Sequence, residues 1–251
     1  MMHVNRLKLV TFDVTDTLLA FRKAPGQYYA DTATKHGIKC NGTELSKNFR
    51  IHFKDMAKNH PNYGLTTGLG WEMWWKELIT RTFKQCHPTI DIKKLDAISH
   101  NLINDYKTFS CWKHCKGALD LLSYLKHKGY TLGIISNFDP RLDATLENAH
   151  IRHYFNFIVA SYDVGVQKPN PNIFEIAMKF SNIKSLSAED CLHVGDSYSL
   201  DYEGAKNAGW NAALVNANNE NGKDYVFVSL FDLHQYIING SGERLQLETK
   251  P

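Results

Sequence analysis

Four short segments of this sequence carry side chains that could act together on a phosphate ester. In chain order these side chains are Asp13 and Asp16, Ser136 and Asn137, Lys168, and Asp196 and Asp201. Carboxylate oxygens suit Mg²⁺, which takes one or two protein carboxylates together with water and phosphate. A hydroxyl and neighbouring backbone N–H groups can hold phosphate oxygens, and a lysine can neutralise the charge that gathers there. A carboxylate can also attack phosphorus and form an aspartyl-phosphate.

Each segment taken alone has an ordinary explanation. Asp13 could cap a helix or a loop, and Lys168 before a proline could be a solvated loop residue. Asp201 could be a surface acid near the start of a helix. Asp139 in NFDPRL is expected to cap a helix whose first residue is Pro140. The four segments favour one shared site because each follows a predicted strand.

The elements that would position these side chains are short apolar runs bounded by Gly, Pro, Asn or Asp. Five such runs predict buried strands: LKLVTFDV, YTLGIISN, FNFIVASY, DCLHVGDS and NAALVNA. Helical stretches lie between most of them, for example at 117–129 and 170–182. This alternation predicts an α/β fold with a doubly wound parallel sheet. Ligands of such sheets bind beyond the carboxyl ends of the strands.

Residues 21–107 break the alternation, because they contain no convincing strand. They contain four helical stretches: GQYYADTATKHG, ELSKNFRIHFKDMAKN, GWEMWWKELITRTFKQ and IKKLDAISHNLINDYKTF. We therefore expect an inserted α-helical cap that is joined to the core near Ala20 and Thr108 and covers the site as a lid. The predicted boundaries are 1–20 and 108–239 for the core, 21–107 for the cap, and 240–251 for a C-terminal tail.

The cap is rich in aromatic residues, which could form a pocket or a packing surface. Trp71, Trp74 and Trp75 have the i, i+3, i+4 spacing of a packing stripe on one helix face. Tyr63 and the loop Gly68–Gly70 are better candidates to face the site.

Composition limits the partners that we expect. The chain has 251 residues, an apolar fraction of 43% and a net charge of +3, which is too small a bias to indicate nucleic-acid binding. No stretch approaches the ~18 apolar residues of a membrane span. Five scattered cysteines without a secretory signal predict reduced thiols in the cytoplasm, with the nucleus left open. The segment CWKHC is weak evidence for zinc, because no second pair of ligands accompanies it.

The four segments also resemble a known family, the haloacid dehalogenase-like hydrolases. FDVTDTLL, IISNF, QKPNP and HVGDSYSLDYEGAKNAGW are similar to that family's four motifs, in order, over a core from residue 7 to about 215. The resemblance implies a parallel α/β core with an α-helical cap. It implies that Asp13 is the nucleophile and that Lys168 steadies it.

The resemblance implies roles for the remaining site residues as well. The carbonyl of Thr15 and the side chain of Asp196 would join Asp13 as Mg²⁺ ligands. Ser136 and the N–H of Asn137 would bind phosphate. Asp201 would support Lys168 or a metal-bound water, and Thr17 would order the loop at the substrate.

Thr15 departs from the family motif, which carries a second aspartate two residues after the nucleophile. That aspartate protonates the leaving oxygen and later activates water. Three interpretations are open: Asp16 substitutes for it as the acid/base, the protein is a slow phosphatase or phosphotransferase, or it binds phosphate or a partner without catalysis. P-type ATPases carry a threonine at the equivalent place and keep a long-lived aspartyl-phosphate. Dehalogenases of the family also lack the second acid, but they lack the acidic fourth motif, so Asp196 and Asp201 argue for Mg²⁺ and against dehalogenation.

The sequence therefore predicts a Mg²⁺-dependent hydrolase or transferase that acts on a small phosphate ester through an aspartyl-phosphate at Asp13 and is slow because of Thr15. The alternative is a catalytically impaired protein that binds phosphate or a partner. Neither nucleic acid nor a membrane is expected as a partner. The identity of the substrate and the oligomeric state do not follow from the sequence.

Overall fold

The core of the molecule is a five-stranded sheet with the strand order β5-β4-β1-β6-β7, in which all neighbouring strands are parallel. The computed structural model describes residues 4–216 and 224–240. The strands are β1 (Leu9–Phe12), β4 (Thr131–Ser136), β5 (Phe157–Ala160), β6 (Cys191–Gly195) and β7 (Asn211–Leu214). Each predicted apolar run contains one of them, so the predicted parallel sheet is confirmed.

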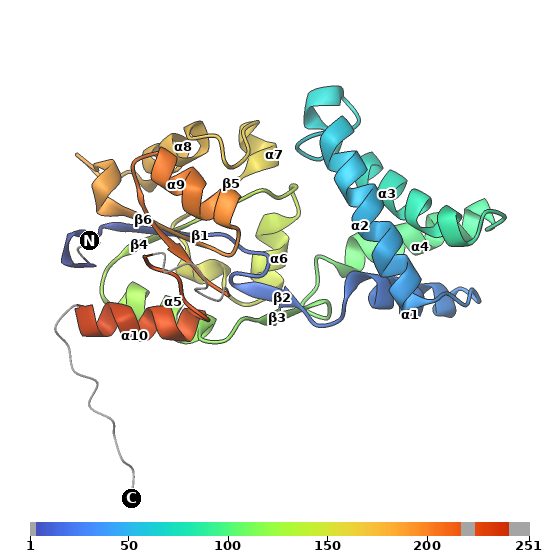
Figure 1. Cartoon of the computed structure of the whole chain (residues 1–251), viewed down its shortest axis with the longest axis horizontal. Helices are drawn as coiled ribbons and strands as arrows, with labels where there is room; N and C mark the ends of the chain where they lie inside the picture. Colours follow the sequence, from blue (N-terminus) through green and yellow to red (C-terminus); the bar gives the residue numbers. More distant parts are fainter. Residues whose placement is uncertain (1–3, 217–223, 241–251) are drawn as a thin grey trace, which may run out of the picture.

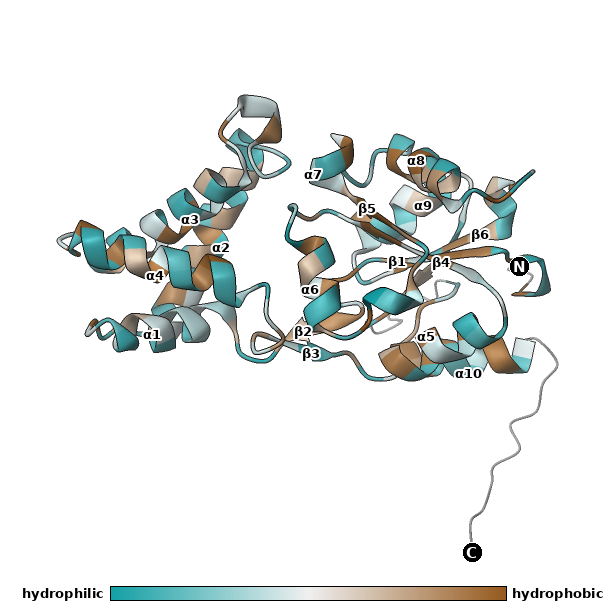
Figure 2. Cartoon of the chain, turned by 180° about the vertical axis from the view of Figure 1, so that it is seen from behind, coloured by the Kyte–Doolittle hydropathy of each residue, from teal (hydrophilic) through white to brown (hydrophobic). Residues whose placement is uncertain are grey.

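Helices cover both faces of this sheet, as expected when parallel strands are joined by crossovers (Figure 1). The core helices are α5 (Ala118–His127), α6 (Leu142–Asn148), α7 (Ser161–Val164), α8 (Asn172–Ser181), α9 (Glu203–Asn207) and α10 (Leu230–Gly240). Val10 and Phe12 of β1 pack in the cluster that contains residues of α5, α6 and α10, whereas Leu9 packs in the cluster of α8 and α9. Figure 2 shows how apolar the central strands are.

The register of the sheet brings three strand ends together. Phe12, the last residue of β1, is aligned with Ile134 of β4 on one side and with Val194 of β6 on the other. The loops that follow β1, β4 and β6 therefore leave the sheet at the same edge. β1 lies at the centre of the sheet with its two neighbours reached in opposite directions, which is where open α/β sheets bind ligands.

Four helices form the cap, which lies beyond this edge of the sheet (Figure 1). They are α1 (Pro25–Lys35), α2 (Gly42–Asn59), α3 (Trp71–Cys86) and α4 (Ile92–Asp105). Asn41 starts α2 by accepting from the backbone N–H groups of Thr43 and Glu44, and Asp91 starts α4 in the same way. The cap has an apolar core of its own, which includes Leu45. The predicted insertion of an all-helical cap after the first strand is confirmed.

A two-stranded antiparallel ribbon joins the cap to the core, and the sequence did not reveal it. β2 (Leu19–Phe21) pairs with β3 (Trp112–His114), each only three residues long. The segment CWKHC runs through β3, and the Nε2–H of His114 donates to the carbonyl of Ala149 at 2.9 Å. Its thiols and imidazole are not among the grouped potential metal ligands of the described residues.

The remaining described segments are short. Single helical turns are η1 (Val4–Arg6), η2 (Leu65–Thr67), η3 (Arg152–Tyr154) and η4 (Ala188–Asp190), and the π-helical turn η5 (Tyr198–Tyr202) precedes α9. α10 includes Gly240, so the last core helix runs one residue past the predicted boundary at 239. The rest of the predicted tail lies outside the described residues. None of the described helices has the length and apolar content that a membrane span requires.

Candidate active site

Asp13 is the first residue after β1, and both neighbouring strands hold it in place. Its backbone N–H donates to the carbonyl of Val194 in β6 at 2.9 Å. Its Oδ1 accepts from the hydroxyl of Ser136 at 2.9 Å and from Nζ of Lys168 at 2.7 Å. The residue is only 8% exposed. Asp13 is therefore a buried carboxylate with one oxygen fixed by a hydroxyl and an ammonium group.

Lys168 is buried as deeply as Asp13, and three oxygens surround its ammonium group. Besides Asp13, Nζ donates to Oδ1 of Asp201 at 2.5 Å and to the carbonyl of Ile135 at 2.8 Å. The side-chain amide of Asn137 fixes its backbone, since the N–H of Lys168 donates to Oδ1 at 2.7 Å and Nδ2 donates to the carbonyl at 3.0 Å. The side chain of Asn137 thus positions Lys168. The predicted phosphate ligand is the backbone N–H of Asn137, which these bonds do not use.

The charges of these groups depend on one another. Burial raises the pKa of Asp13 to about 6, although Lys168 acts in the opposite direction. Burial disfavours the ammonium form of Lys168, but Asp13 and Asp201 outweigh it and raise the pKa of the lysine. Burial also acts against the Asp201 carboxylate, yet Lys168 and the hydrogen bond from His193 hold its pKa well below the usual range. Lys168 and Asp201 therefore form a buried ion pair beside Asp13.

A buried polar chain behind Asp201 was not predicted. Nε2 of His193 lies 3.0 Å from Oδ1 of Asp201, and Nδ1 lies 2.9 Å from the hydroxyl of Thr11. Burial lowers the pKa of His193, so the neutral ring donates from Nε2–H to the carboxylate and accepts from Thr11 at Nδ1. The other oxygen of Asp201 accepts from the backbone N–H of Ser197 at 2.9 Å. The signal in the sequence was a polar residue inside each of two apolar strands, and the two are partners in the sheet.

Three carboxylates gather at this site. Asp13, Asp196 and Asp201 offer oxygens that lie within 4.8 Å of one another. Burial and then the charge of Asp13 raise the pKa of Asp196 to about 7. Thr17 links the first loop to the last by donating its hydroxyl to Oδ1 of Asp196 at 3.3 Å. Closely spaced carboxylate oxygens that repel one another fit a hard divalent cation such as Mg²⁺. Both oxygens of Asp201 have donors, so Asp13 and Asp196 are the better ligands.

Thr15 and Asp16 take different positions in the loop after β1. Asp16 is exposed, and its backbone lies in the left-handed region at a φ of 57°. Its N–H donates to the carbonyl of Leu19 at 2.7 Å, and its carbonyl accepts from the side chain of Asn216. Asp16 is not part of the carboxylate group formed by Asp13 and its neighbours. Thr15, which is half-buried, lines a cavity between the core and the cap.

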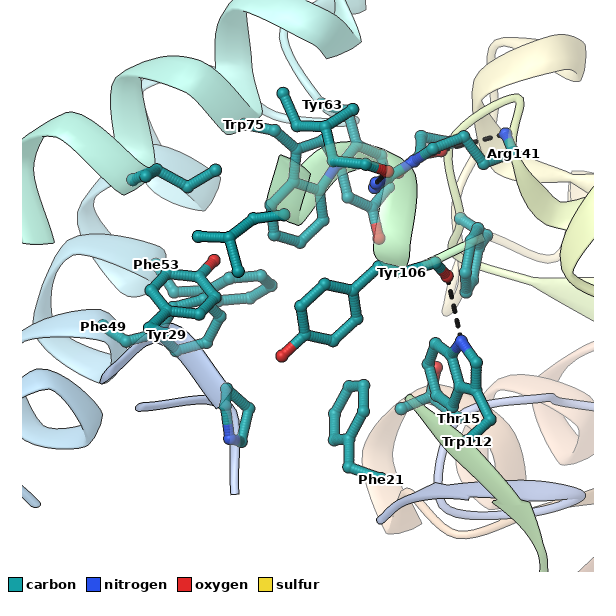
Figure 3. A pocket seen from close by; sticks show the side chains of 16 residues that line it. Thr15, Phe21, Tyr29, Phe49, Phe53, Tyr63, Trp75, Tyr106, Trp112 and Arg141 are labelled. Atoms are coloured by element: carbon teal, nitrogen blue, oxygen red, sulfur yellow. Dashed lines mark hydrogen bonds and ion pairs between the residues drawn. The ribbon is translucent and has the colours of Figure 1, made fainter. Parts of the chain in front are cut away.

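This cavity has a volume of about 220 Å³ and is largely aromatic (Figure 3). Its lining residues come from both domains and are Thr15, Phe21, Pro25, Tyr29, Phe49, Phe53, Tyr63, Trp75, Ile79, Leu102, Ile103, Tyr106, Trp112, Phe138, Asp139 and Arg141. Tyr63 closes one side by donating its hydroxyl to the carbonyl of Asn137 at 2.8 Å. Tyr63 thus faces the site as predicted, whereas residues 68–70 do not line the cavity.

Asp139 has partners beyond those of the predicted helix cap. α6 begins at Leu142, two residues after Pro140. The carboxylate of Asp139 accepts from Nε and Nη2 of Arg141 at 2.8 and 2.6 Å and from the indole N–H of Trp75 at 2.7 Å. Two buried charged groups of the core are thereby joined to the cap helix α3. Oδ1 of Asp139 also accepts from the backbone N–H of Arg141 at 3.0 Å, the local bond expected of a capping aspartate. The predicted helix start at Pro140 was wrong, and the tertiary contacts across the domain boundary were not predicted.

The tryptophans of α3 pack within the cap and also contact Arg141 of the core. Trp74 is buried in the cap and donates its indole N–H to the carbonyl of His60 at 2.9 Å, as a packing stripe predicts. The rings of Trp71 and Trp75 instead lie 5.2 and 5.0 Å from the guanidinium of Arg141. Nη1 of Arg141 also donates to the carbonyl of Ile103 in α4 at 3.0 Å. Trp75 also packs against the ring of Trp74 in the apolar cluster of the cap. The stripe prediction is therefore confirmed for Trp74 and Trp75, and the contact of Trp71 and Trp75 with Arg141 was not predicted.

A second polar contact joins the tip of the cap to the core. Nδ2 of Asn62 donates to the carbonyl of Ser161 at 2.8 Å, and the hydroxyl of Ser161 donates to Oδ1 of Asn62 at 2.8 Å. Asn62 is buried, although it follows the exposed end of α2. Together with Tyr63 and Arg141, this pair holds the cap against the loop after β4 and the start of α7.

Comparison with known proteins agrees with this architecture along most of the chain. The family model described as haloacid dehalogenase-like hydrolase matches residues 7–209. The rhythmically expressed gene 2 protein of Drosophila melanogaster is 40% identical over 96% of this chain and 99% of its own length. The human haloacid dehalogenase-like hydrolase domain-containing protein 3 is 34% identical over 86% of this chain and 84% of its own length.

Solved structures share the fold at lower sequence identity. A HAD phosphatase from Thermococcus onnurineus is 22% identical, with a TM-score of 0.64 over 95% of this chain and 100% of its own. The HAD-hydrolase YfnB of Bacillus subtilis, described as bound to magnesium and as revealing interdomain movement, is 20% identical, with a TM-score of 0.67 over 92% of this chain and 99% of its own. An L-2-haloacid dehalogenase from Xanthobacter autotrophicus has a TM-score of 0.66 over 92% of this chain and 98% of its own, at 20% identity.

Proposed function

Because the chain belongs to the haloacid dehalogenase-like hydrolases, we propose that it removes or transfers the phosphoryl group of a small phosphate ester through an aspartyl-phosphate at Asp13. The observation that carries this proposal is the environment of the Asp13 carboxylate. Among the described residues, its side-chain contacts with Ser136 and Lys168 are both made by Oδ1. Oδ2 is the oxygen that attacks phosphorus.

The proposed reaction has two steps. In the first, Oδ2 of Asp13 attacks phosphorus while the bond from phosphorus to the alcohol oxygen breaks, and that oxygen takes a proton from solvent. In the second, water attacks the phosphorus of the aspartyl-phosphate, which restores the carboxylate and releases inorganic phosphate. Ser136 and the backbone N–H of Asn137 hold the phosphate oxygens, and the ammonium of Lys168 offsets the negative charge of the reacting groups.

Asp13, Asp196 and the carbonyl of Thr15 would hold Mg²⁺, and Asp201 would act on the site by holding Lys168. The grouped carboxylate oxygens and the raised pKa of Asp196 support this assignment. Bound Mg²⁺ would place positive charge against the phosphate and allow two anions to approach each other. The neutral His193 holds Asp201, which keeps the lysine aimed at Asp13.

Thr15 makes turnover slow in this proposal. Its hydroxyl does not ionise near neutral pH, so it cannot serve as a general acid and base. The exposed position of Asp16, outside the carboxylate group, weakens its candidacy as a replacement. The same observations favour the second candidate function, a protein that binds phosphate or a partner and has lost catalysis.

The cap serves as a lid that excludes water and bulky substrates. The paired strands β2 and β3 would guide its movement, and the magnesium-bound relative described as showing interdomain movement supports this idea. We also propose a cytoplasmic site of action, with the nucleus left open, which suits five cysteines that form no disulfide. A small molecule is the proposed partner, rather than nucleic acid or a membrane.

Covalent labelling tests the proposal. Purified protein with Mg²⁺ is treated with radiolabelled acetyl phosphate, and the modified peptide is located by mass spectrometry. The parent and the matched control Asp16→Asn should be labelled at Asp13, and Asp13→Asn should not be labelled. If Asp13→Asn were labelled as strongly as the parent, Asp13 would not be the nucleophile. A parent that is neither labelled nor active on any phosphate donor would favour the binding protein.

A further inference from the structure

The cavity beside the nucleophile is placed to receive the alcohol part of an ester. Thr15, two residues beyond Asp13, lines it on one side, and Phe138, next to the predicted phosphate-binding residue Asn137, lines it on another. An ester whose phosphate lies at Asp13 would therefore project its alcohol group into this space. The volume of about 220 Å³ exceeds the ~150 Å³ of a cavity that holds benzene.

The walls of the cavity are mostly aromatic rings in contact with one another. Nine of its sixteen lining residues are Phe, Tyr or Trp. The rings of Phe21 and Trp112 lie 4.5 Å apart between centroids, and those of Tyr29 and Phe49 lie 5.6 Å apart. Figure 3 shows the ring of Tyr106 between these two groups. Such a wall favours a flat apolar group through burial and ring contacts.

The cavity has no spare positive charge for a second anion. Of its lining residues only Asp139 and Arg141 are charged, and they neutralise each other. The guanidinium is also held by the carbonyl of Ile103 and by two indole rings. A carboxylate or a second phosphate in the cavity would lose its hydration without gaining a cation, which is unfavourable.

The cavity offers few polar groups for a sugar. The hydroxyl of Tyr63 is already used by Asn137. Tyr29 and Tyr106 contribute phenol groups, and burial raises the pKa of both, so they stay protonated and can each donate one hydrogen bond. A sugar would leave most of its hydroxyls without partners, at a cost for each buried group.

We infer that the substrate is the monophosphate of an uncharged, flat and largely apolar alcohol, which carries no second anionic group. This inference rests on the proposed function of the same site. The cap aromatics select the alcohol, and the phenol groups of Tyr29 and Tyr106 recognise a single polar atom on it.

Three matched esters test this inference: 3-phenylpropyl phosphate, propyl phosphate and the phosphate ester of 3-hydroxypropionate. All three are esters of primary alcohols and differ in the group at the far end. With Mg²⁺ present, kcat/KM should be at least tenfold higher for the phenyl ester than for the propyl ester, and lowest for the carboxylate. Phe53→Asp, which places a charge in the cavity, should abolish the preference, whereas Phe180→Asp on the exposed face of α8 should keep it.

Two further measurements separate failure of the inference from failure of the proposed function. Labelling by acetyl phosphate, which has no ring, reports the nucleophile alone. Binding of 3-phenylpropyl phosphonate and propyl phosphonate, measured by calorimetry, reports the cavity without turnover and without any variant. If Asp13 is labelled but the phenyl compounds are no better than the propyl compounds, the inference is wrong and the proposed function stands. If no donor labels Asp13, a tenfold preference for the phenyl phosphonate would still support the cavity's selectivity, and equal binding would overturn it.

Discussion

The two sides of the candidate site are built from different interactions. We call the buried polar residues around Asp13, Lys168 and Asp201 the core wall, and the aromatic residues of the cap that line the cavity the cap wall. On the core wall, the ammonium of Lys168 and the carboxylate of Asp201 have three fixed partners each within a few residues of the strand ends. On the cap wall, rings such as those of Tyr29 and Tyr106 meet mainly through apolar contact. Hydrogen bonds fix atoms in direction, whereas ring packing fixes only shape. The difference supports our proposals that core residues carry out the reaction and that cap residues select the substrate.

The largest effect on the free energy of unfolding should come from removing the ammonium group of Lys168. Lys168→Met leaves the buried carboxylates of Asp13 and Asp201 without a cation, so the free energy of unfolding should fall by about 3–5 kcal/mol. Urea unfolding measures this, and labelling at Asp13 should be lost as well. Lys76→Met removes a half-exposed ion pair with Asp96 and should cost at most about 1 kcal/mol. Equal losses in the two variants would contradict a buried charge pair at the core.

The next largest effect concerns the residue where the two walls meet. Thr15→Asp should speed release of phosphate tenfold or more, because a positioned general acid–base contributes about 10²–10⁴-fold, or roughly 3–5 kcal/mol of barrier. Steady-state hydrolysis and the lifetime of the label at Asp13 measure it. A parent that turns over at ordinary rates and slows only in Asp16→Asn would show that Asp16 is the acid.

A smaller effect should follow from cutting one hydrogen bond between the walls. Trp75→Phe keeps a ring near Arg141 but removes the N–H that binds Asp139, and it should lower the free energy of unfolding by about 1.5–3 kcal/mol. Hydrogen exchange should quicken at residues 139–141. Trp74→Phe removes a similar bond that lies within the cap and should leave exchange there unchanged. If Trp75→Phe and Trp74→Phe changed hydrogen exchange in the same way, Trp75 would have no specific role in holding the cap against the core.

The smallest effect is the change of Mg²⁺ affinity with pH, which depends on the protonation of Asp196. Below a pH of about 7 the carboxyl of Asp196 holds a proton, because burial and Asp13 raise its pKa to that value. Mg²⁺ must displace this proton, so its affinity should fall as the pH falls and be about tenfold weaker at pH 6 than at pH 8. Calorimetry measures the affinity, and Asp196→Asn should leave only the smaller pH dependence that Asp13 contributes, because the pKa of Asp13 is raised to about 6. A parent whose affinity does not change with pH would remove Asp196 from the metal site.

The two walls also differ in how far the sequence predicts them. The structure brings Asp13, Ser136, Lys168 and Asp196 together, as their positions after apolar strand runs predict, and their chemical roles stay predictions. Parallel strands end at one edge, so local sequence is enough to gather such residues.

Other parts of the site depend on pairings that the sequence does not state. Thr11 and His193 lie inside strands, and only the sheet register reveals that they face each other. Tyr29 lies in α1 and Tyr106 directly follows α4, so the two come from opposite ends of the cap sequence, and only tertiary packing brings their rings into one cavity. Local capping preference predicts the bond from the backbone N–H of Arg141 to Asp139, but it does not reveal the contact of the same carboxylate with Trp75.

The pairing of β2 with β3 brings the two ends of the cap segment together. Leu19 faces His114 and Phe21 faces Trp112, so the chain leaves the core and returns to it at adjacent points. In topological terms the whole cap is the loop of one β-hairpin, and a short turn could close that hairpin without disturbing the sheet. Insertions are best tolerated where entry and exit lie side by side. The pairing of β2 with β3 therefore allows a different insertion to replace the cap without a change in the order or register of the core strands.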